Sequence, residues 1–328
     1  MLLLALKVLK MHKGSLQYWH HRRAYRRLPR LRAMPQLSEQ SLTNIVAFKV
    51  GMTHVGVIDN TESASKGTEV FRACTVLEIP QMEVYGIRLY KLDDNFYSNS
   101  SIVIYSKELA AKLKMKNIKN DESKIADIKQ KLEGYSDVRI LVAAYPKSVG
   151  LGRHPIRFEA GAGGKSVAEK FEFASSVLGK QVSAQQYFKN GEYVDVLSIS
   201  KGKGWQGPIK RFGTARLSHK ATQKTRHIGT LGPFKPPKVL FTVPQAGQLG
   251  FNYRTEHNKL ILKMGAKSEA GQINKQGGFT NYGVVKSDYI VLQGSVPGPA
   301  KRLLQIRKSI MNRNANGIKE PKITYITK

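Results

Sequence analysis

Apolar and polar residues alternate along several short segments of the chain, and this two-residue period predicts β-strands. The run from Asn44 to Asp59 alternates but is broken by Gly51, so we expect two short strands around a turn there. Further strands are predicted at Thr75–Ile79, Val84–Tyr90, Ile102–Tyr105, Val138–Ala143, Tyr193–Ile199, Lys259–Met264 and Tyr289–Leu292. Most of the chain that can form regular structure is therefore expected to be β.

Helical spacing of apolar residues is concentrated in the middle of the sequence. Helices are predicted at Ser106–Met115, Asp121–Leu132 and Val167–Leu178, with a helical turn at Ala184–Phe188. Strands at both ends with helices between them indicate an α+β, mainly β protein: an open β-barrel interrupted by an inserted α/β domain.

The charge changes the picture from a generic β protein to one with a polyanionic partner. The 328 residues carry 54 Lys and Arg against 23 Asp and Glu, a formal net charge of +31, while 41% hydrophobic residues suffice for a core. Such a balance points to nucleic acid or an anionic surface. The single cysteine, Cys74, excludes a disulfide framework, a multi-thiolate zinc site and an iron–sulfur cluster, and it fits a reducing cytoplasm.

The cations are concentrated in two stretches that contain no acidic residue. Residues 1–38 hold nine Lys and Arg, and residues 196–255 hold eleven. Residues 81–189 instead hold 18 bases and 12 acids, as an ordinary folded domain would. Because cations without acids repel one another, we expect phosphates to neutralise the two acid-free stretches.

The first stretch interleaves arginines with aromatic residues and reads as an extended RNA-binding arm. Pro29 and Pro35 prevent a continuous helix, and Tyr18, Trp19 and Tyr25 could stack on bases. The candidate RNA-binding residues are Lys13, Arg22, Arg23, Arg26, Arg27, Arg30 and Arg32. A disordered solubilising tail is the alternative. The apolar run Met1–Leu9 precedes the basic segment, which is the reverse of a signal peptide; a start at Met11 or a mitochondrial presequence stays open.

The second stretch has thirteen glycines and prolines between residues 201 and 254, too many for a regular helix or central strand. It is predicted to be a long loop that an RNA partner orders. The candidate RNA-binding residues are Lys201, Lys203, Trp205, Lys210, Arg211, Arg216, His219, Lys220, Lys224, Arg226, His227, Lys235, Lys238 and Arg254. The aromatic rings of Trp205 and Phe234 either pack locally or contact a nucleobase.

Other candidate chemistry is weak. The segment GAGGKS at Gly161–Ser166 lacks the first glycine of a phosphate loop, because Glu159 stands there, and the polar run 153–159 argues against a preceding apolar strand. Neither His20 with His21 nor His219 with His227 has a nearby acidic or thiolate ligand, so no metal site is predicted. Cys74 lies in an apolar strand, which indicates a buried structural thiol. No Ser, His and Asp arrangement has the character of a triad.

Long blocks of the sequence resemble the large-subunit ribosomal protein L3 family. They include HKGSL from His12, AFKVGMTH at Ala47–His54 and NGEYVDVLSISKGKG at Asn190–Gly204. KGKGWQGPIKRFG, IGTLGPFKPPKV, VPQAGQLGFNYRTEHNKLILKMG and GGFTNYGVVKSDYIVLQGSVPGPAKRL continue the match, which covers about residues 12–315. The length, the middle insertion and the short C-terminus are similar to archaeal members.

The resemblance implies a translation-factor-like β-barrel, an inserted α/β domain, a basic arm and a finger loop whose tip, at Phe234, lies near the peptidyl transferase centre. Relatives usually have Trp at that position, and Phe keeps the stacking face but loses the indole N–H donor. The predicted organisation is an arm (1–43), a first barrel part (44–80), an inserted domain (81–189), a barrel strand (190–200), a finger loop (201–257) and the remaining barrel and C-terminal segment (258–328).

We therefore expect a structural, non-enzymatic ribosomal protein that binds large-subunit rRNA in the cytoplasm and supports early subunit assembly. Its expected partners are this rRNA and neighbouring ribosomal proteins, without DNA, membrane or small-molecule substrate. No cofactor is expected, and Mg²⁺ only through the bound rRNA. An RNA-modifying enzyme would need a cofactor pocket, and no motif in the sequence predicts one. A DNA-compacting protein is the other alternative, but such proteins are usually smaller and lack a glycine-rich loop of this length.

Overall fold

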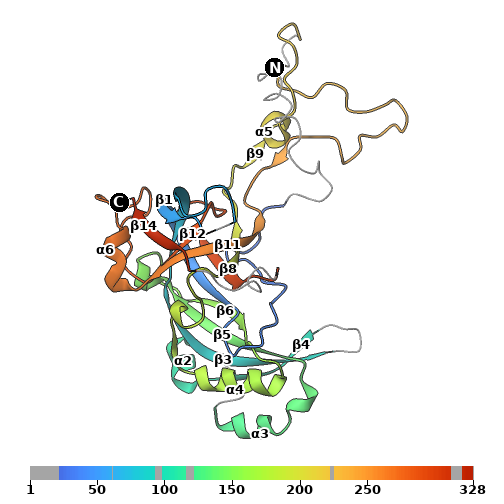
Figure 1. The fold of residues 1–328 in the computed structure, drawn as a ribbon. Coiled ribbons are helices and arrows are strands. Elements are labelled where there is room, and N and C mark those ends of the chain that lie inside the picture. Colours follow the sequence, from blue (N-terminus) through green and yellow to red (C-terminus); the bar gives the residue numbers. More distant parts are fainter. Residues whose placement is uncertain are drawn as a thin grey trace. The chain divides into compact units, whose positions relative to one another are not determined.

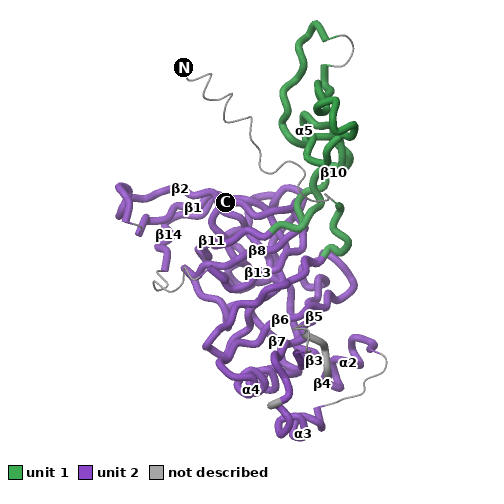
Figure 2. The backbone as a smooth tube through the Cα atoms, turned by 90° about the vertical axis from the view of Figure 1, so that its right-hand side faces the viewer, with its two compact units in different colours: residues 1–27, 199–254 green, residues 28–198, 255–328 purple. Residues whose placement is uncertain are grey.

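The computed structural model describes residues 22–60, 62–92, 98–115, 122–221, 225–311 and 320–327. These residues form a mainly β protein with three sheets and short helices, as expected (Figure 1). The chain divides into two compact units, which Figure 2 colours separately. Unit 1 comprises residues 1–27 and 199–254, and unit 2 comprises residues 28–198 and 255–328.

The largest sheet has the strand order β13-β8-β11-β12-β2-β1-β14, and β13 also pairs with β1, so the strand order closes on itself. Its strands are β1 (Asn44–Ile58), β2 (Glu69–Glu78), β8 (Tyr193–Ile199), β11 (Tyr253–Gly265), β12 (Tyr289–Gln293), β13 (Leu303–Lys308) and β14 (Lys322–Ile326). The first half of β1 pairs with β13 and the second half with β14, while β2 runs along the opposite edge.

One strand prediction is wrong in an informative way. The run Asn44–Asp59 was predicted to form two strands, but β1 is continuous over 15 residues. Its register against β2 shifts between Lys49 and Gly51, which is a β-bulge and not a turn. A side chain at Gly51 would come within 3.0 Å of the Phe279 ring, so the glycine permits close packing there.

The second sheet of unit 2 has the order β4-β3-β5-β6, with β7 paired to β3. Its strands are β3 (Gln81–Leu92), β4 (Ser98–Tyr105), β5 (Asp137–Tyr145), β6 (Ile156–Gly161) and β7 (Gln181–Val182). Helix α4 (Val167–Val177) buries Phe171 and Ala174 in the main core, which also takes in residues of the closed sheet. Leu109 and Leu113, in and just after helix α2 (Lys107–Lys112), pack instead with Tyr85 and Leu141.

The predicted helices are confirmed in place, but two of them are shorter. Ser106–Met115 forms α2 alone, and Asp121–Leu132 gives η1 (Glu122–Lys124), then α3 (Ile125–Lys129), in which Ile128 is buried. The other short elements are η2 (Leu132–Gly134), η3 (Pro146–Val149), η4 (Ala184–Gln186), α5 (Pro208–Phe212), η5 (Lys267–Glu269) and α6 (Ala270–Ile273).

The prediction that no strand precedes the GAGGKS segment is wrong, because β6 ends at its first glycine. Residues 153–159 are polar, yet Ile156–Gly161 is a strand, because Phe158 and Ala160 are buried on one face while Arg157 and Glu159 occupy the other. The loop after it still offers no amide cradle. The Gly163 and Gly164 N–H groups donate to the Ser41 and Leu37 carbonyls at 2.8 and 2.9 Å. The Lys165 N–H donates to Glu169 Oε2 at 2.8 Å.

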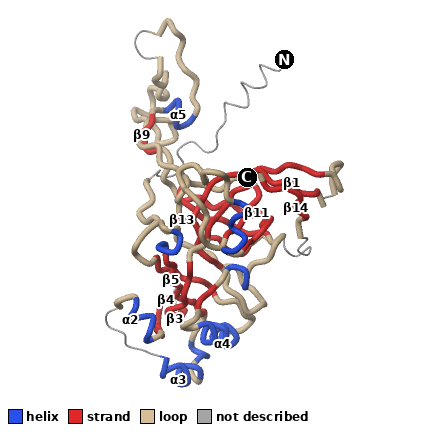
Figure 3. The backbone as a smooth tube through the Cα atoms, turned by 90° about the vertical axis from the view of Figure 1, so that its left-hand side faces the viewer, coloured by secondary structure: helices blue, strands red, loops and turns tan. Residues whose placement is uncertain are grey.

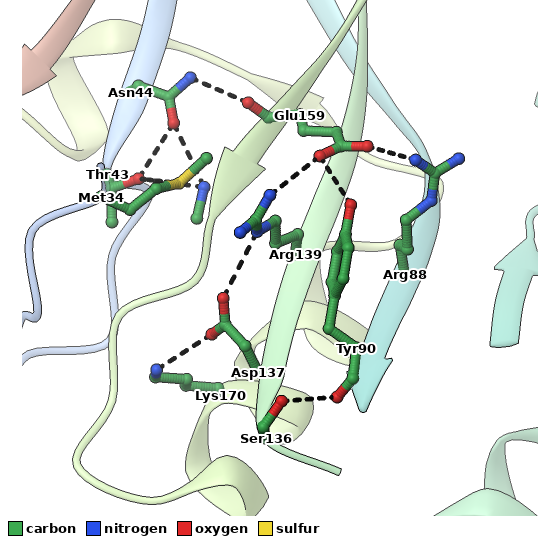
Figure 4. Close-up of polar contacts among 11 residues, drawn as sticks. Met34, Thr43, Asn44, Arg88, Tyr90, Ser136, Asp137, Arg139, Glu159 and Lys170 are labelled. Carbon is green, nitrogen blue, oxygen red and sulfur yellow. Dashed lines mark hydrogen bonds and ion pairs between the residues drawn. The ribbon is translucent and has the colours of Figure 1, made fainter. Parts of the chain in front are cut away.

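A polar network occupies one face of the second sheet (Figure 4). The Glu159 carboxylate accepts hydrogen bonds from Arg88, from Arg139 at 3.3 Å and from the Tyr90 hydroxyl at 3.0 Å. Arg139 also lies over the Tyr90 ring, 4.3 Å from its centroid. One carboxylate of β6 thus ties together side chains of β3 and β5, so we interpret the network as structural.

Two buried carboxylates hold loops against the closed sheet. Asp195 is fully buried and accepts from Arg307 Nη2 at 3.0 Å, while Arg307 Nη1 reaches the Ala33 carbonyl at 2.9 Å. Burial alone would raise the pKa of Asp195, but hydrogen bonds from Asn258, His257 and Arg307 outweigh it and lower that pKa. For Glu78, burial dominates and raises the pKa, although the Lys286 and Ser287 N–H groups donate to it.

Cys74 is buried, as predicted for a structural thiol. Burial raises the pKa of this thiol to about 11, which keeps it protonated at neutral pH.

Candidate nucleic-acid interface

Unit 1 contains no acidic residue. Residues 1–27 supply seven Lys and Arg and residues 199–254 supply eleven, so the unit holds +18 of the net +31 of the chain. The remaining +13 is spread over unit 2, which is about three times longer and contains all 23 acids. The charge pattern read from the sequence thus coincides with a structural unit. The arm and the finger loop, which are far apart in sequence, together supply the positive charge of this unit.

The two ends of the finger loop run antiparallel and are joined by backbone hydrogen bonds. The Ser200 N–H donates to the Asn252 carbonyl at 2.9 Å, and the Lys203 N–H donates to the Leu249 carbonyl at 3.0 Å. Beyond them, β9 (Trp205–Gln206) pairs with β10 (Gly247–Gln248). These contacts form a narrow stem, which satisfies backbone groups that an irregular loop would leave to solvent.

Glycine is required at one point of this stem and favoured at another. Gly250 has φ of +73°, a left-handed conformation, and any side chain there would clash with the Lys201 carbonyl. A side chain at Gly247 would come within 2.7 Å of the Arg211 guanidinium. The high glycine content therefore has a specific cause here: close approach of the two sides of the stem.

Helix α5 begins with Pro208 at its first position and ends at Gly213, which has left-handed φ of +73°. Its Arg211 donates from Nη1 to the Gln245 carbonyl at 2.9 Å and from Nε to the Gln248 carbonyl at 3.2 Å. Burial lowers the pKa of this guanidinium. Arg211, predicted as an RNA contact, thus fastens α5 to the returning side of the loop, and its role in RNA binding remains a prediction.

The arm is hydrogen-bonded along the end of the finger loop. The Ala24 N–H donates to the Phe251 carbonyl at 2.7 Å, and Asn252 Nδ2 donates to the Arg22 carbonyl at 2.8 Å. The Tyr253 hydroxyl accepts from the Arg26 N–H at 3.1 Å and donates to the Arg26 carbonyl at 3.0 Å. Because these bonds use only the backbone of the arm, its arginine side chains remain available to a partner.

Residues 214–246 connect α5 to β10. In the part that the structure describes they form loops and turns without a helix or strand (Figure 3). Phe234 is 91% exposed and Trp205 is 76% exposed. Neither aromatic ring is packed into a core of this unit. This exposure argues against local packing of either ring, and a contact with a nucleobase remains a prediction.

Nearly all predicted RNA-binding residues that the structure describes are exposed; Arg211 is the half-buried exception and Trp205 was considered above. The exposed ones in unit 1 are Arg22, Arg23, Arg26, Arg27, Lys201, Lys203, Lys210, Arg216, His219, Lys220, Arg226, His227, Lys235, Lys238 and Arg254. Arg30 and Arg32 are also exposed but belong to unit 2. The predictions at Lys13 and Lys224 lie outside the described residues.

Two residues that the sequence predictions did not assign to the interface help to build it. Asn252 and Tyr253 hold the arm. Tyr25, which the sequence predicted could stack on a base, is 94% exposed between the arm arginines. The roles of Asn252 and Tyr253 depend on a pairing between segments more than 200 residues apart, which no local pattern reveals.

Within the described ranges, no group of three or more His, Cys, Asp or Glu side chains is placed to hold a metal ion. Among the same residues, no helix is long and apolar enough to cross a membrane.

The comparison with known protein families decides between the remaining interpretations. The profile of the ribosomal protein L3 family matches residues 6–327. This chain belongs to that family. The family consists of ribosomal proteins and not of enzymes, which confirms both the resemblance seen in the sequence and the expected absence of catalysis. The expected place in the cytoplasmic ribosome agrees with the same match.

Three archaeal relatives illustrate the match, and each is named large ribosomal subunit protein uL3. The Methanothermobacter thermautotrophicus protein is 42% identical over 325 residues, with 96% of both chains covered. The Thermoplasma volcanium protein is 41% identical over 324 residues, again with 96% of both chains covered. The Methanocaldococcus jannaschii protein is 37% identical over 332 residues, covering 99% of this chain and 98% of the relative. The L3 chain described here is thus of the archaeal type.

Proposed function

We propose that this chain is a structural constituent of the large ribosomal subunit that binds large-subunit rRNA through unit 1. The observation that carries the proposal is the coincidence of an acid-free unit, +18 in charge, with exposed side chains on almost every described cation in it. Such a unit cannot balance its own charge, whereas rRNA phosphates can.

Binding proceeds by charge neutralisation along an irregular backbone. Lys and Arg side chains of the arm and finger loop displace counterions from neighbouring rRNA segments and bridge phosphates that would otherwise repel each other. Shape and phosphate contacts dominate over base readout, because the deep, narrow major groove of an RNA helix is closed to side chains. Bridging of this kind supports early subunit assembly, since it brings RNA segments together before other proteins join.

Unit 2 supplies the folded scaffold in this proposal. We interpret its closed sheet as the translation-factor-like barrel, and the β3–β7 sheet with its helices as the inserted domain at residues 81–189. Strand β8 precedes the finger loop in the chain and β11 begins within its last residues, and both strands belong to the closed sheet. The loop is thereby tied to the scaffold at both of its ends in sequence.

The tip of the finger loop is proposed to approach the peptidyl transferase centre, where RNA performs the chemistry. Phe234 offers a freely exposed ring for stacking on a base or sugar. With no indole N–H, the ring acts through its face alone.

Sedimentation of native lysate before and after a wash at about 1 M salt tests this function, because screening at that ionic strength removes peripheral charged contacts. We expect the chain to remain with the large subunit and to be released by RNase but not by DNase. A chain that sediments freely at all salt concentrations would contradict the ribosomal role. Release by DNase would favour the DNA-compacting alternative.

A further inference from the structure

A second exposed surface lies on the long β1–β2 hairpin of unit 2. There β14 joins the second half of β1, so that β2, β1 and β14 form three adjacent strands (Figure 2). One face of these strands carries large apolar side chains in contact with solvent. Phe71 is 62% exposed, Tyr325 53% and Met52 44%. We name this surface, which also includes His54 and Ala73, the hairpin face.

The register brings its two aromatic residues to the same level of the sheet. Gly56 of β1 stands opposite Phe71 on one side and opposite Tyr325 on the other. Residues directly opposite each other in neighbouring strands share a face. Two aromatic side chains therefore flank the central strand at Gly56, where the side chains of Glu69 and Thr324 cover the glycine.

The fold does not account for these exposed residues. The other face of the same strands is already buried, with Val55 at 0% and Val57 at 5% exposure, and Ile323 and Ile326 of β14 pack there. A sheet with one buried face normally carries polar residues on the other. A contiguous exposed apolar patch on such a sheet is typical of a binding surface.

The charge of the hairpin face differs from that of unit 1. Residues 52–75 and 322–326, which form these strands and their turn, contain three acids and three bases, a net charge of zero in a chain of +31. Glu69 and Lys322 both stand opposite Ile58, so their charges offset each other on this face. The Thr324 hydroxyl also donates to the Glu69 carboxylate across Gly56. A surface without excess cations, and with a carboxylate at its centre, is unfavourable for phosphates.

We propose that the hairpin face binds a segment of a neighbouring ribosomal protein, which packs an apolar side chain against the exposed rings of Phe71 and Tyr325 and pairs a Lys or Arg with Glu69. The proposal rests on the proposed function, since it assigns a protein partner within the large subunit. The alternative occupant is rRNA stacked on the two aromatic rings, and the charge of the face disfavours it.

Site-specific photo-crosslinking in assembled large subunits tests the occupant. We would replace Phe71 by p-benzoylphenylalanine in the full chain, purify the subunits, irradiate them and map the adducts by mass spectrometry. The expected adduct joins position 71 to a ribosomal protein segment with an apolar residue and a Lys or Arg, and it resists RNase. An adduct to rRNA alone, or no adduct at all, would overturn the proposal.

The same probe at Tyr25 is the matched control, because this aromatic residue is exposed on the basic arm. Its expected adduct is with rRNA. Failure at Tyr25 with a protein adduct at Phe71 would count against RNA binding by the arm while supporting the hairpin face. An rRNA adduct at both positions would support the proposed function and refute this inference.

Reversing the charge at position 69 checks the identity of the occupant independently, because a protein and an rRNA occupant predict opposite effects. Glu69→Lys should lower the yield of the protein adduct at position 71 at least tenfold, because it places a cation against the basic partner segment. If rRNA occupied the face, the same substitution would strengthen binding and raise the adduct yield. Glu62→Lys, at an exposed turn position of the same hairpin, controls for the overall charge and should leave the yield within twofold. Thermal unfolding confirms that both variants fold.

Discussion

The folded structure of unit 2 and that of unit 1 are stabilised by different interactions. Unit 2 buries almost all of the apolar core in two sheets, and its buried charges have partners, such as Asp195 with Arg307. Among the described residues of unit 1, Phe212 is the large apolar side chain that is buried to a comparable degree, and backbone hydrogen bonds between the arm and the two ends of the finger loop fix its shape.

This difference shows that net charge need not be uniform for a protein to fold. Unit 2 mixes 36 bases with 23 acids and can fold through hydrophobic burial alone. Unit 1 gains little from burial and carries unopposed positive charge, which rRNA phosphates would offset under the proposed function. Substitutions in unit 2 should therefore change stability, and substitutions in unit 1 should change RNA binding and assembly.

The largest effect is expected from breaking the buried ion pair in unit 2. Arg307→Met leaves the Asp195 carboxylate buried without its guanidinium, which should lower the free energy of unfolding by about 3–5 kcal/mol. Urea unfolding of the free protein measures this loss. The exposed Arg226→Ala serves as a control and should stay within about 0.5 kcal/mol of the wild type. Equal losses in both variants would remove the distinction between the two units.

Arg211→Ala should act inside unit 1. It removes two charge-assisted hydrogen bonds, to the Gln245 and Gln248 carbonyls. A hydrogen bond of this kind contributes about 1.5–3 kcal/mol to stability. Limited proteolysis within 241–250 should accelerate roughly tenfold or more, because local opening becomes easier. Arg226→Ala should leave this cleavage unchanged.

Both variants should nevertheless slow large-subunit assembly while the melting temperature of unit 2 stays the same. Equal loss of thermal stability and assembly would contradict an assignment of these arginines to the RNA-facing unit.

Acid should destabilise unit 2 through Asp195. The pKa of its carboxyl is lowered below 3.8 in the folded protein, so its contribution to stability is present above about pH 3.8 and is lost as the pH falls through the lowered value. The stability difference between the wild type and Asp195→Asn should therefore shrink below pH 3.8, as followed by urea unfolding at successive pH values.

The contribution of Glu78 to stability should have the opposite pH dependence in the same experiment. Because burial raises its pKa above 4.5, its favourable contribution is present at low pH and is lost as the pH rises through the raised value. Glu78→Gln should thus alter stability mainly above pH 4.5. A parallel pH dependence for the two variants would be inconsistent with these environments.

Phe234→Ala should have the smallest effect on the free protein, because the ring is 91% exposed. The melting temperature and subunit assembly should be unchanged. If the tip lies near the peptidyl transferase centre, tRNA binding or the fidelity of peptidyl transfer should change in purified subunits. Normal translation kinetics would count against a role for this ring.

Much of the strand content could be predicted from the sequence because local alternation determines it. Tyr193–Ile199 was predicted with the bounds that β8 has, and Val167–Leu178 exceeds α4 by one residue. Strand β6 was missed because its outward residues, Arg157 and Glu159, made it look polar. The bulge at Gly51 was mistaken for a turn, since a glycine within an alternating run gives the same local signal in both cases.

The stretches that make up the candidate interface can be located in the sequence, but the contacts that build its structure cannot. Acid-free composition identifies both of its stretches, because charge is a property of the sequence itself. That Tyr253 holds the backbone at Arg26, or that Arg211 fastens α5 to Gln245 and Gln248, depends on contacts distant in the sequence. Such contacts emerge only when the chain is folded.

The salt dependence of rRNA binding tests most directly the claim that unit 1 makes the RNA contacts. One variant replaces four exposed cations of unit 1, Lys201, Lys203, Arg226 and Lys235, by Gln; the matched control replaces Lys66, Lys147, Lys180 and Lys267 of unit 2. The slope of log affinity against log salt should fall by about three in the first variant, since each lost phosphate contact removes roughly 0.7–0.9. The control should keep the wild-type slope. Equal changes in the two variants, or a larger change in the control, would contradict the account.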